Sequence, residues 1–183
     1  TKSDRICNIK GSIDILSSND LDVRLSTIES STEADSNAGD INVVVGGAVS
    51  VYDASTISSD SDASSRLENP NSLGDAGVIN ISADTFMLQE STITSVSTGK
   101  QSGQAGSVQV VANGIALDSS FISTNTQSDL DTNTAAKITL NSNNQDITIV
   151  DSGLIAISEG ASNAGSINLS GNNILLRGDE LGL

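Results

Sequence analysis

Residue types on which most active sites depend are scarce in this sequence. Its 183 residues include no histidine, no tryptophan, one cysteine, one proline and one methionine. Because there is no histidine and Cys7 has no partner base, no familiar acid–base or nucleophile constellation can be assembled. The sequence also lacks a nucleophile elbow and a phosphate-binding loop. We therefore expect no enzymatic activity and no catalytic residues.

The scarcity of rings, thiols and long apolar runs also limits the structural class. Aromatic residues make up 2% of the chain, so a globular core built on large rings is not expected. Cys7 has no second cysteine with which to pair, which leaves a buried or end-turn thiol, or an intermolecular disulfide. No apolar run approaches the roughly 18 residues of a transmembrane helix. The 36% hydrophobic content is nevertheless too high and too regularly placed for a disordered chain.

Positive charge is scarce as well. There are 8 lysines and arginines against 23 aspartates and glutamates, which gives a formal net charge of −15. A surface of this sign repels nucleic-acid phosphates and anionic lipid headgroups. We therefore expect no nucleic-acid partner and no membrane insertion, and we interpret the acidity as a source of solubility.

The sequence does contain one unit that is repeated along most of its length. The clearest copy, residues 75–93, has a small-residue turn, two apolar residues at period 2, a polar turn, a second such pair and a third apolar position. Alternation at period 2 in runs of three to five residues is typical of β-strands, and no segment keeps the i, i+3, i+4 spacing of a helix.

The apolar positions of this unit recur in order. The first pair recurs as Ile13/Ile15, Ile41/Val43, Ile79/Ile81, Val108/Val110, Ile138/Leu140 and Ile167/Leu169. The second pair recurs as Leu21/Val23, Val49/Val51, Phe86/Leu88, Ile115/Leu117, Ile147/Ile149 and Ile174/Leu176. The third position recurs as Ile28, Ile57, Ile93, Ile122 and Leu154. Successive units start 28, 38, 29, 30 and 29 residues apart.

This spacing predicts a stack of turns, because one short unit cannot bury its own apolar face. Two-residue hairpin turns are missing, so the strands are expected to pair between turns and not within them. The sequence predicts an all-β fold, a parallel β-helix of about six turns of roughly 29 residues. We expect a single solenoid over residues 1–183, with incomplete turns at both ends, as in a piece of a longer protein, and an insertion around residues 58–74.

Small and amide residues precede each first strand and mark the predicted corners. These are Asn37 and Gly39, Asp75 and Gly77, Gln104 and Gly106, and Asn163 and Gly165. Glycine suits a corner that needs a positive φ or a close backbone approach, and stacked amides can form hydrogen bonds along a stack. Ala136 departs from the pattern, so its corner should be closed differently. Ser26, Ser91, Ser120 and Ser152 form a second column, in which Ala54 is expected to take the place of serine in the second turn.

The units Asn-Ala-Gly-Ser-Ile-Asn-Leu-Ser-Gly-Asn-Asn-Ile-Leu-Leu-Arg at 163–177 and Asn-Ala-Gly-Asp-Ile-Asn-Val at 37–43 resemble the filamentous-haemagglutinin-like exoproteins. Bacteria, including cyanobacteria, secrete these proteins by the two-partner (type V) route. The resemblance covers roughly residues 11–177. It implies a right-handed β-helix, a secreted or cell-surface location, and a role in adhesion, aggregation or matrix building. The Asn-Pro-Asn-Ser at 69–72 matches the family's secretion-domain signature only in part, and we interpret it as coincidence.

The insertion in the second turn is one candidate for recognition. The link from Ile57 to Ile79 is 22 residues long, against 13 to 16 elsewhere, and it contains Arg66, Glu68 and Pro70. Long loops on rigid scaffolds often carry recognition residues. The alternative is a tolerated bulge that has no partner.

Two pairs of aspartates lie in matching loops two turns apart, Asp60 with Asp62 and Asp129 with Asp131. Paired carboxylates supply oxygen ligands of the kind that Ca²⁺ takes. The sequence has neither EF-hand spacing nor the Gly-Gly-x-Gly-x-Asp nonapeptide of calcium-binding solenoids. We expect solvated acidic loops and no cofactor, with Ca²⁺ at these four residues as the alternative.

Two further sequence patterns could indicate a functional site, and we expect neither to do so. The Arg-Gly-Asp triplet at 177–179 is used by some extracellular proteins to bind integrins, but three residues match by chance and this triplet lies at an expected strand end. The outward positions of the first strands are mostly uncharged and polar, and therefore lack the acid, base and cation needed to cleave an acidic polysaccharide. They are Asn42, Asn80, Gln109, Thr139 and Asn168.

The sequence therefore predicts a structural or adhesive segment of a secreted β-helical exoprotein. Its expected partners are other copies or flanking repeats of the same exoprotein, with surface carbohydrate or a host or matrix protein as further candidates. Two alternatives stay open. One is a filament subunit that stacks end to end through its open strand edges. The other is a β-helix that binds or cleaves carbohydrate.

Overall fold

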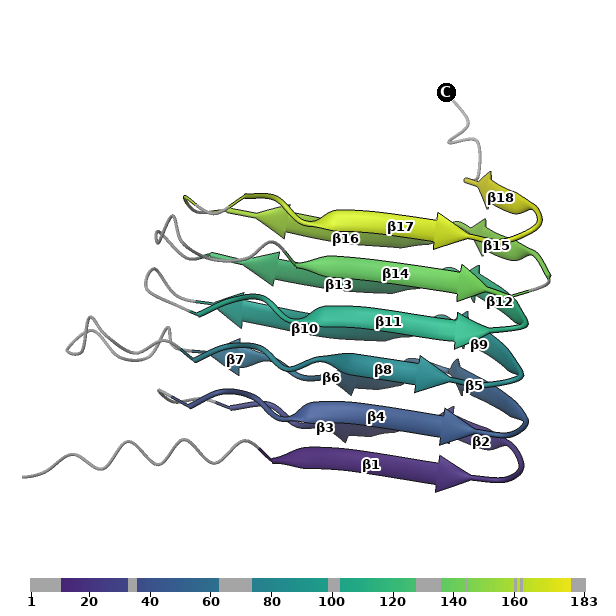
Figure 1. The fold of residues 1–183 in the computed structure, drawn as a ribbon, viewed down its shortest axis with the longest axis horizontal. Coiled ribbons are helices and arrows are strands. Elements are labelled where there is room, and N and C mark those ends of the chain that lie inside the picture. Colours follow the sequence, from purple (N-terminus) through teal and green to yellow (C-terminus); the bar gives the residue numbers. More distant parts are fainter. Residues whose placement is uncertain are drawn as a thin grey trace, which may run out of the picture.

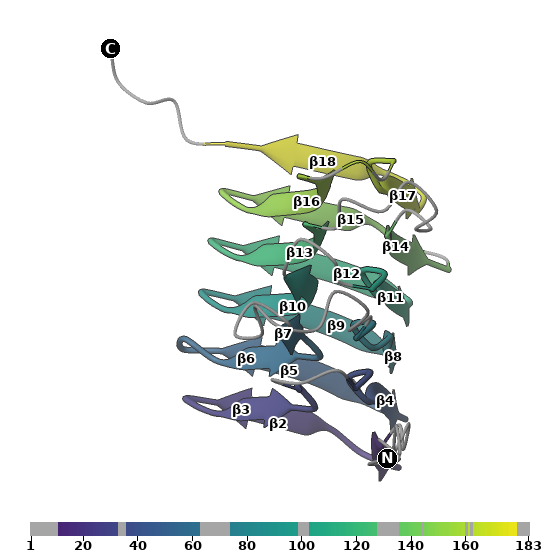
Figure 2. The ribbon, with the colours of Figure 1, turned by 90° about the vertical axis from the view of Figure 1, so that its left-hand side faces the viewer.

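The computed structural model describes residues 11–32, 36–62, 74–98, 103–127, 136–143, 145–159, 161 and 163–178. Within these ranges every regular element is a β-strand, and all strand pairs are parallel. The strands form three sheets that run side by side along a rod (Figures 1 and 2). The predicted all-β, parallel solenoid is confirmed.

Each turn of the chain contributes strands to the three sheets in the same order. The first sheet contains β1 (Ser12–Ser17), β4 (Asp40–Val45), β8 (Ile79–Ser82), β11 (Ser107–Ala112), β14 (Lys137–Ser142) and β17 (Ser166–Ser170). The second contains β2 (Leu21–Arg24), β5 (Ala48–Tyr52), β9 (Thr85–Gln89), β12 (Gly114–Asp118), β15 (Ile147–Val150) and β18 (Ile174–Arg177). The third contains β3 (Thr27–Glu29), β6 (Thr56–Ser58), β7 (Ser61–Asp62), β10 (Thr92–Thr98), β13 (Phe121–Thr126) and β16 (Gly153–Ser158).

The described chain makes about five complete turns and part of a sixth, which agrees with the predicted solenoid of about six turns with incomplete ends. Five turns have strands in all three sheets, and the sixth is represented by β17 and β18. In each turn the chain passes from the first sheet to the second and then to the third as it rises along the rod. The coil is right-handed (Figures 1 and 2). This is the hand that parallel crossover connections overwhelmingly adopt.

The strand register is the predicted one at all three apolar positions. Ile41 lies opposite Ile79, which lies opposite Val108, and the third position runs unbroken from Ile28 to Leu154. The core is a stack of inward side chains, most of them 0–2% exposed in the central turns. A branched aliphatic column of this kind fills the narrow interior without large rings.

One residue of the predicted serine column is wrong. Ser55, and not Ala54, continues the column in the second turn, where Asp53 and Ala54 both have positive φ. Each other turn has a single residue of positive φ before its column serine. The inserted residue is therefore absorbed by a second left-handed position, and the serine stays in register. The column is Ser26, Ser55, Ser91, Ser120 and Ser152, and each backbone N–H donates to the next hydroxyl at 3.0–3.2 Å.

The predicted corner glycines serve close approach and not positive φ. A Cβ on Gly77 would overlap the Gly39 carbonyl oxygen and the Ser59 hydroxyl, and one on Gly106 would overlap the Gly77 carbonyl and the Ser95 hydroxyl. The hydroxyl groups of Ser59 and Ser95 lie in this space and form hydrogen bonds within the rod. Ser59 Oγ donates to the Gly39 carbonyl at 2.5 Å, and Ser95 Oγ donates to the Gly77 carbonyl at 2.6 Å. Each hydroxyl thus ties the end of a turn to the start of the same turn.

The turn that leads to Ala136 is the exception. Thr124 lies opposite Ser95 in the next turn and is fully buried, yet its Oγ1 has no hydrogen-bond partner in the described structure. Ala136 holds the corner position that Gly106 holds one turn earlier. A Cβ on Gly106 would overlap the Ser95 hydroxyl, so the methyl group of Ala136 takes up the equivalent space beside Thr124. The following turn has Ala156 opposite Thr124. The irregular corner therefore coincides with the loss of the hydroxyl tie.

Candidate functional surfaces

The corner side chains bond to the backbone of the next turn. Asn37 Oδ1 accepts a hydrogen bond from the Asp75 N–H at 2.9 Å, and Asp75 Oδ1 accepts one from the Gln104 N–H at 2.7 Å. The stack that was expected to run from amide to amide therefore runs from side chain to backbone. The carboxylate of Asp75 does the same work as the amide of Asn37. Asn163 lies at the equivalent corner of the sixth turn and is exposed.

Asp60 is half-buried, and both oxygens of its carboxylate accept hydrogen bonds from groups of the protein. Its Oδ2 accepts a hydrogen bond from Thr94 Oγ1 at 2.9 Å, and its Oδ1 accepts one from the Val96 N–H at 2.8 Å. Burial raises the pKa of the Asp60 carboxyl above its ordinary value; these two hydrogen bonds oppose the shift, and the nearby Glu29 carboxylate adds to it. Asp60 therefore fastens the end of β6 to β10.

Asp62 lies two residues further along, where it accepts a hydrogen bond from Thr98 Oγ1 at 2.8 Å. Within the described ranges, no three acidic or cysteine side chains gather in a group that could hold a metal ion. The other two calcium candidates, Asp129 and Asp131, lie outside the described residues, so the alternative of Ca²⁺ binding stays a prediction.

The remaining sequence candidates fall partly or wholly outside the described ranges. Arg66, Glu68 and Pro70 of the proposed recognition loop lie outside them, as do Cys7 and Asp179. Arg177 ends β18 and Gly178 follows it, both exposed.

The outward amides of the first sheet form the predicted column. Asn80 Nδ2 donates to Asn42 Oδ1 at 3.0 Å, and Asn42 Nδ2 donates to Asp14 Oδ1 at 2.8 Å. The hydrogen bonds from Asn42 and, to a lesser extent, Ser12 hold the pKa of the Asp14 carboxyl below its ordinary value. The column continues through Gln109, Thr139 and Asn168. This column is therefore polar, and Asp14, Asn42 and Asn80 are hydrogen-bonded to one another, whereas Leu16 and Val44 on the same face are exposed apolar residues.

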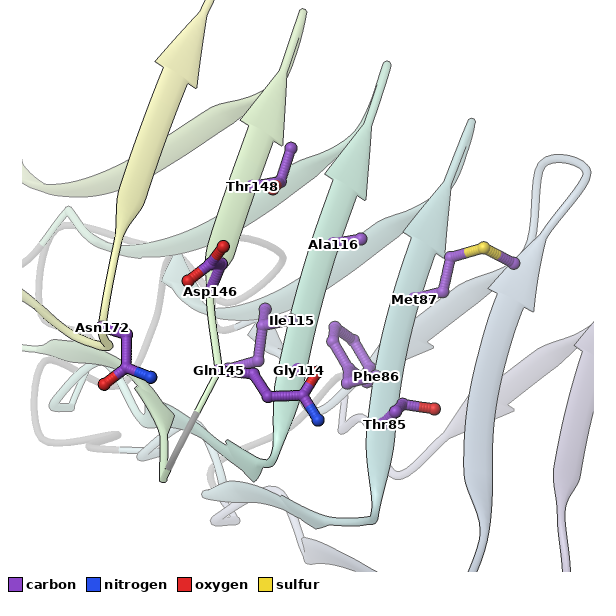
Figure 3. Close-up of a pocket in the computed structure, with 10 residues that line it drawn as sticks. All are labelled: Thr85, Phe86, Met87, Gly114, Ile115, Ala116, Gln145, Asp146, Thr148 and Asn172. Carbon is purple, nitrogen blue, oxygen red and sulfur yellow. The ribbon is translucent and has the colours of Figure 1, made fainter.

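The outer face of the second sheet carries a hollow that the sequence reading missed. It has a volume of about 500 Å³ and spans β9, β12 and β15. Figure 3 shows Met87, Ala116 and Thr148 in a row on these neighbouring strands, with Gly114 beside Ala116. β12 thus presents two very small outward residues between larger ones. This signal is present in the sequence, but it can be recognised only when the cross-strand register is known.

Polar side chains surround the floor of this hollow. Gln145, Asp146 and Asn172 lie at one end, where the chain turns into β15 and β18, and Thr85 lies on the opposite side (Figure 3). Asp146 Oδ1 accepts hydrogen bonds from the backbone N–H of Asn173 at 3.2 Å and from its Nδ2 at 2.8 Å. The Asp146 carboxylate is therefore held in place at the rim.

The sixth turn leaves its inward apolar residues open among the described residues. Ile167 and Ile174 are each 43% exposed and Leu176 is 64% exposed, whereas Ile138 and Ile147, one turn earlier, are 0% exposed. A hollow of about 550 Å³ opens at this end and is lined by Ile149, Leu154, Ile167, Leu169 and Leu176, among others. The face has the shape and chemistry of the surface on which another turn stacks.

In the described part of the chain, no helix has the length and apolar character required to span a bilayer. Comparison of the sequence and structure with known protein families, curated proteins and solved structures found no match.

Proposed function

We propose that this chain is a structural segment of a secreted or cell-surface β-helical protein, which acts in adhesion, aggregation or matrix building through its outer faces and without catalysis. The observation that carries the proposal is the continuity of the rod. Three parallel sheets keep one register through every described turn. Outward side chains therefore form columns along the molecule, a surface that suits extended contact better than a single small substrate.

Two further features support this proposal. The repeat units at 37–43 and 163–177 resemble those of filamentous-haemagglutinin-like exoproteins, which have such roles. Several hydrogen-bonding side chains of the corners and of the first sheet are bonded within the rod itself, as Asn37, Asp75 and Asn42 illustrate. Polar side chains that form hydrogen bonds between turns are consistent with a structural role.

The location is tested by labelling producing cells with antibodies raised against the folded chain. We expect label on intact cells or in the culture medium. Label that appears only after the cells are permeabilised would contradict the proposal. The adhesive role is tested with beads coated with the chain, which should aggregate or attach to the producing cells more than beads coated with the core variant Ile79→Asp. Equal attachment of the two would contradict it.

The open sixth turn favours one second candidate, a filament in which copies stack end to end. Exposed inward residues at a strand edge invite pairing with another strand layer. Because the two ends of a rod differ, such a contact is heterologous and extends without closing. The expected partner surface is another turn of the same kind of solenoid.

Sedimentation velocity and electron microscopy over a concentration series test the filament. Rods that lengthen with concentration are expected, and Leu176→Lys should prevent the lengthening because it places a charge in the stacked face. Leu175→Lys is the matched control, since Leu175 lies on the same strand and is 53% exposed but is not in the inward column. A monomer at all concentrations, or equal effects of the two variants, would exclude this candidate.

A further inference from the structure

We infer that the hollow on the outer face of the second sheet is a binding groove for a neutral saccharide segment. The groove is defined by Gly114 and Ala116 on β12, Thr85 and Met87 on β9, Thr148 on β15, and Gln145, Asp146 and Asn172 at the rim (Figure 3). Its volume of about 500 Å³ falls within the range of small-molecule sites.

Gly114 is a glycine that the fold itself does not require. Its φ is not positive, and a Cβ added there would meet no backbone atom, its nearest neighbour being Gln145 Oε1 at 3.3 Å. Gly77 and Gly106, in contrast, are packed directly against backbone carbonyls. Gly114 is the first residue of β12, where it provides no side chain to pack, and a glycine in a strand often marks a place where a ligand approaches closely. Gly114, which is half-exposed and has the Gln145 side chain beside it, and the exposed Ala116 together form a low stretch of β12 between Thr85 and Met87 on one side and Thr148 on the other.

The lining favours a ligand that is rich in hydroxyl groups and carries no charge. The floor of Gly114, Ala116 and Met87 can pack against the C–H face of a sugar ring. The amides of Gln145 and Asn172, the Thr85 hydroxyl and the Asp146 carboxylate are groups that can bond sugar hydroxyls. Among the described residues, no lysine or arginine lines the groove, and the chain has a net charge of −15, which disfavours phosphate, sulfate and uronate ligands.

The same geometry argues against a peptide and against cleavage. β12 is paired on both sides, with β9 and β15, so it has no free edge to which a peptide strand could add. Glycosidic cleavage usually needs two carboxylates that flank the scissile bond. Asp146 is the one carboxylate among the described residues that line the groove. The groove is therefore suited to holding a saccharide and not to cutting it.

Titration of the folded chain with neutral oligosaccharides, namely glucose, mannose, galactose and N-acetylglucosamine oligomers, tests this inference by calorimetry. One or more series should bind, and sulfated and uronate oligomers should bind more weakly. Ala116→Leu and Gly114→Val fill the groove and should each weaken binding about tenfold or more. Thr139→Leu places the same type of side chain on the outer face of the first sheet and should leave affinity unchanged, with circular dichroism confirming that all variants fold.

The saccharide ligand rests on the proposed adhesive function for its biological meaning, but the two fail in different ways. Absence of binding to every neutral oligomer, stronger binding of the anionic ones, or equal affinity of Ala116→Leu and the wild type would overturn the groove. A chain that still coats beads and aggregates cells in that case would leave the adhesive rod standing. Intracellular location together with saccharide binding would overturn the proposed function and retain the groove.

Discussion

At the scale of single residues, several aspartates of this acidic chain serve the fold and not only its solubility. Asp20, Asp40, Asp60 and Asp75 each accept a hydrogen bond from a backbone N–H of the following turn. Asp20 and Asp40 lie at the starts of strands, Asp60 lies in the gap between β6 and β7, and Asp75 lies at a corner, all places where a strand carbonyl is not in position to accept. A side-chain acceptor placed there satisfies a donor that would otherwise lose its partner.

Two replacements of Asp75 distinguish the contribution of its acceptor oxygen to stability from that of its negative charge. Asp75→Ala removes the partner of the Gln104 N–H and should lower the free energy of unfolding by about 1 kcal/mol. Asp75→Asn keeps an acceptor oxygen, as Asn37 does one turn earlier, and should cost less than half as much. Denaturant unfolding of the three proteins measures the difference. Equal losses in the two variants would show that charge, and not hydrogen bonding, is what matters at this corner.

Asp60 should make stability depend on pH in the direction opposite to that of an ordinary paired carboxylate. Because burial raises its folded-state pKa, the folded protein binds the proton more tightly than the unfolded chain does. Its contribution to stability is therefore fully present below the ordinary aspartate pKa and is lost as the pH rises through the raised value. Unfolding measured from acidic to neutral pH should show wild type losing stability relative to Asp60→Asn. A difference that stays constant, or that changes in the opposite direction, would contradict this.

At the scale of one turn, buried hydroxyls that follow the third apolar position close the second, third and fourth turns upon themselves. Ser59 and Ser95 bind the first carbonyl of their own turn, and Ser97 and Thr126 bind Gly74 and Gly103 at the next inward position. These groups are fully or almost fully buried. Since a buried hydroxyl without a partner is costly, the ties contribute to the uniqueness of the coil as well as to its stability.

Thr124 and Ser95 provide a matched comparison of these ties. Thr124→Val keeps the volume and removes a hydroxyl that has no partner in the described structure, so it should stabilise the protein by about 1 kcal/mol. Ser95→Ala removes a bonded hydroxyl and should destabilise it by about 1 kcal/mol. Chemical denaturation decides between these signs. Destabilisation by Thr124→Val would mean that the hydroxyl is satisfied after all.

Elements of this kind are predictable from sequence where one physical rule dominates. The pairing of Ile79 with Val108 follows from the alternation of apolar and polar residues along each strand and from the stacking of apolar residues on those of the next turn. Ser55 was missed because the chain absorbs an extra residue through two left-handed positions, which no hydrophobic pattern records. Gly114 and Ala116 could not be read as a groove because the residues on either side of them, Met87 and Thr148, belong to other turns. Surface shape depends on neighbours that are distant in sequence.

At the scale of the whole molecule, the rod is close to one-dimensional, and each turn contacts only the turns beside it. Stability is then approximately a sum over turns and their interfaces. The middle turns have neighbours on both sides, whereas the sixth turn lacks one among the described residues. The value of an inward side chain should therefore depend on its position along the rod and on whatever stacks upon its end.

Two isoleucine truncations measure this dependence. Ile93→Ala opens a cavity at a fully buried position and should cost about 2–5 kcal/mol. Ile167→Ala, at a position that is 43% exposed, should cost about 1 kcal/mol in dilute protein, since much of the side chain is already in water. If copies stack on this end, the cost of Ile167→Ala should rise with protein concentration while that of Ile93→Ala stays constant. Thermal unfolding at several concentrations tests this, and equal costs in dilute solution would show that the end is already covered.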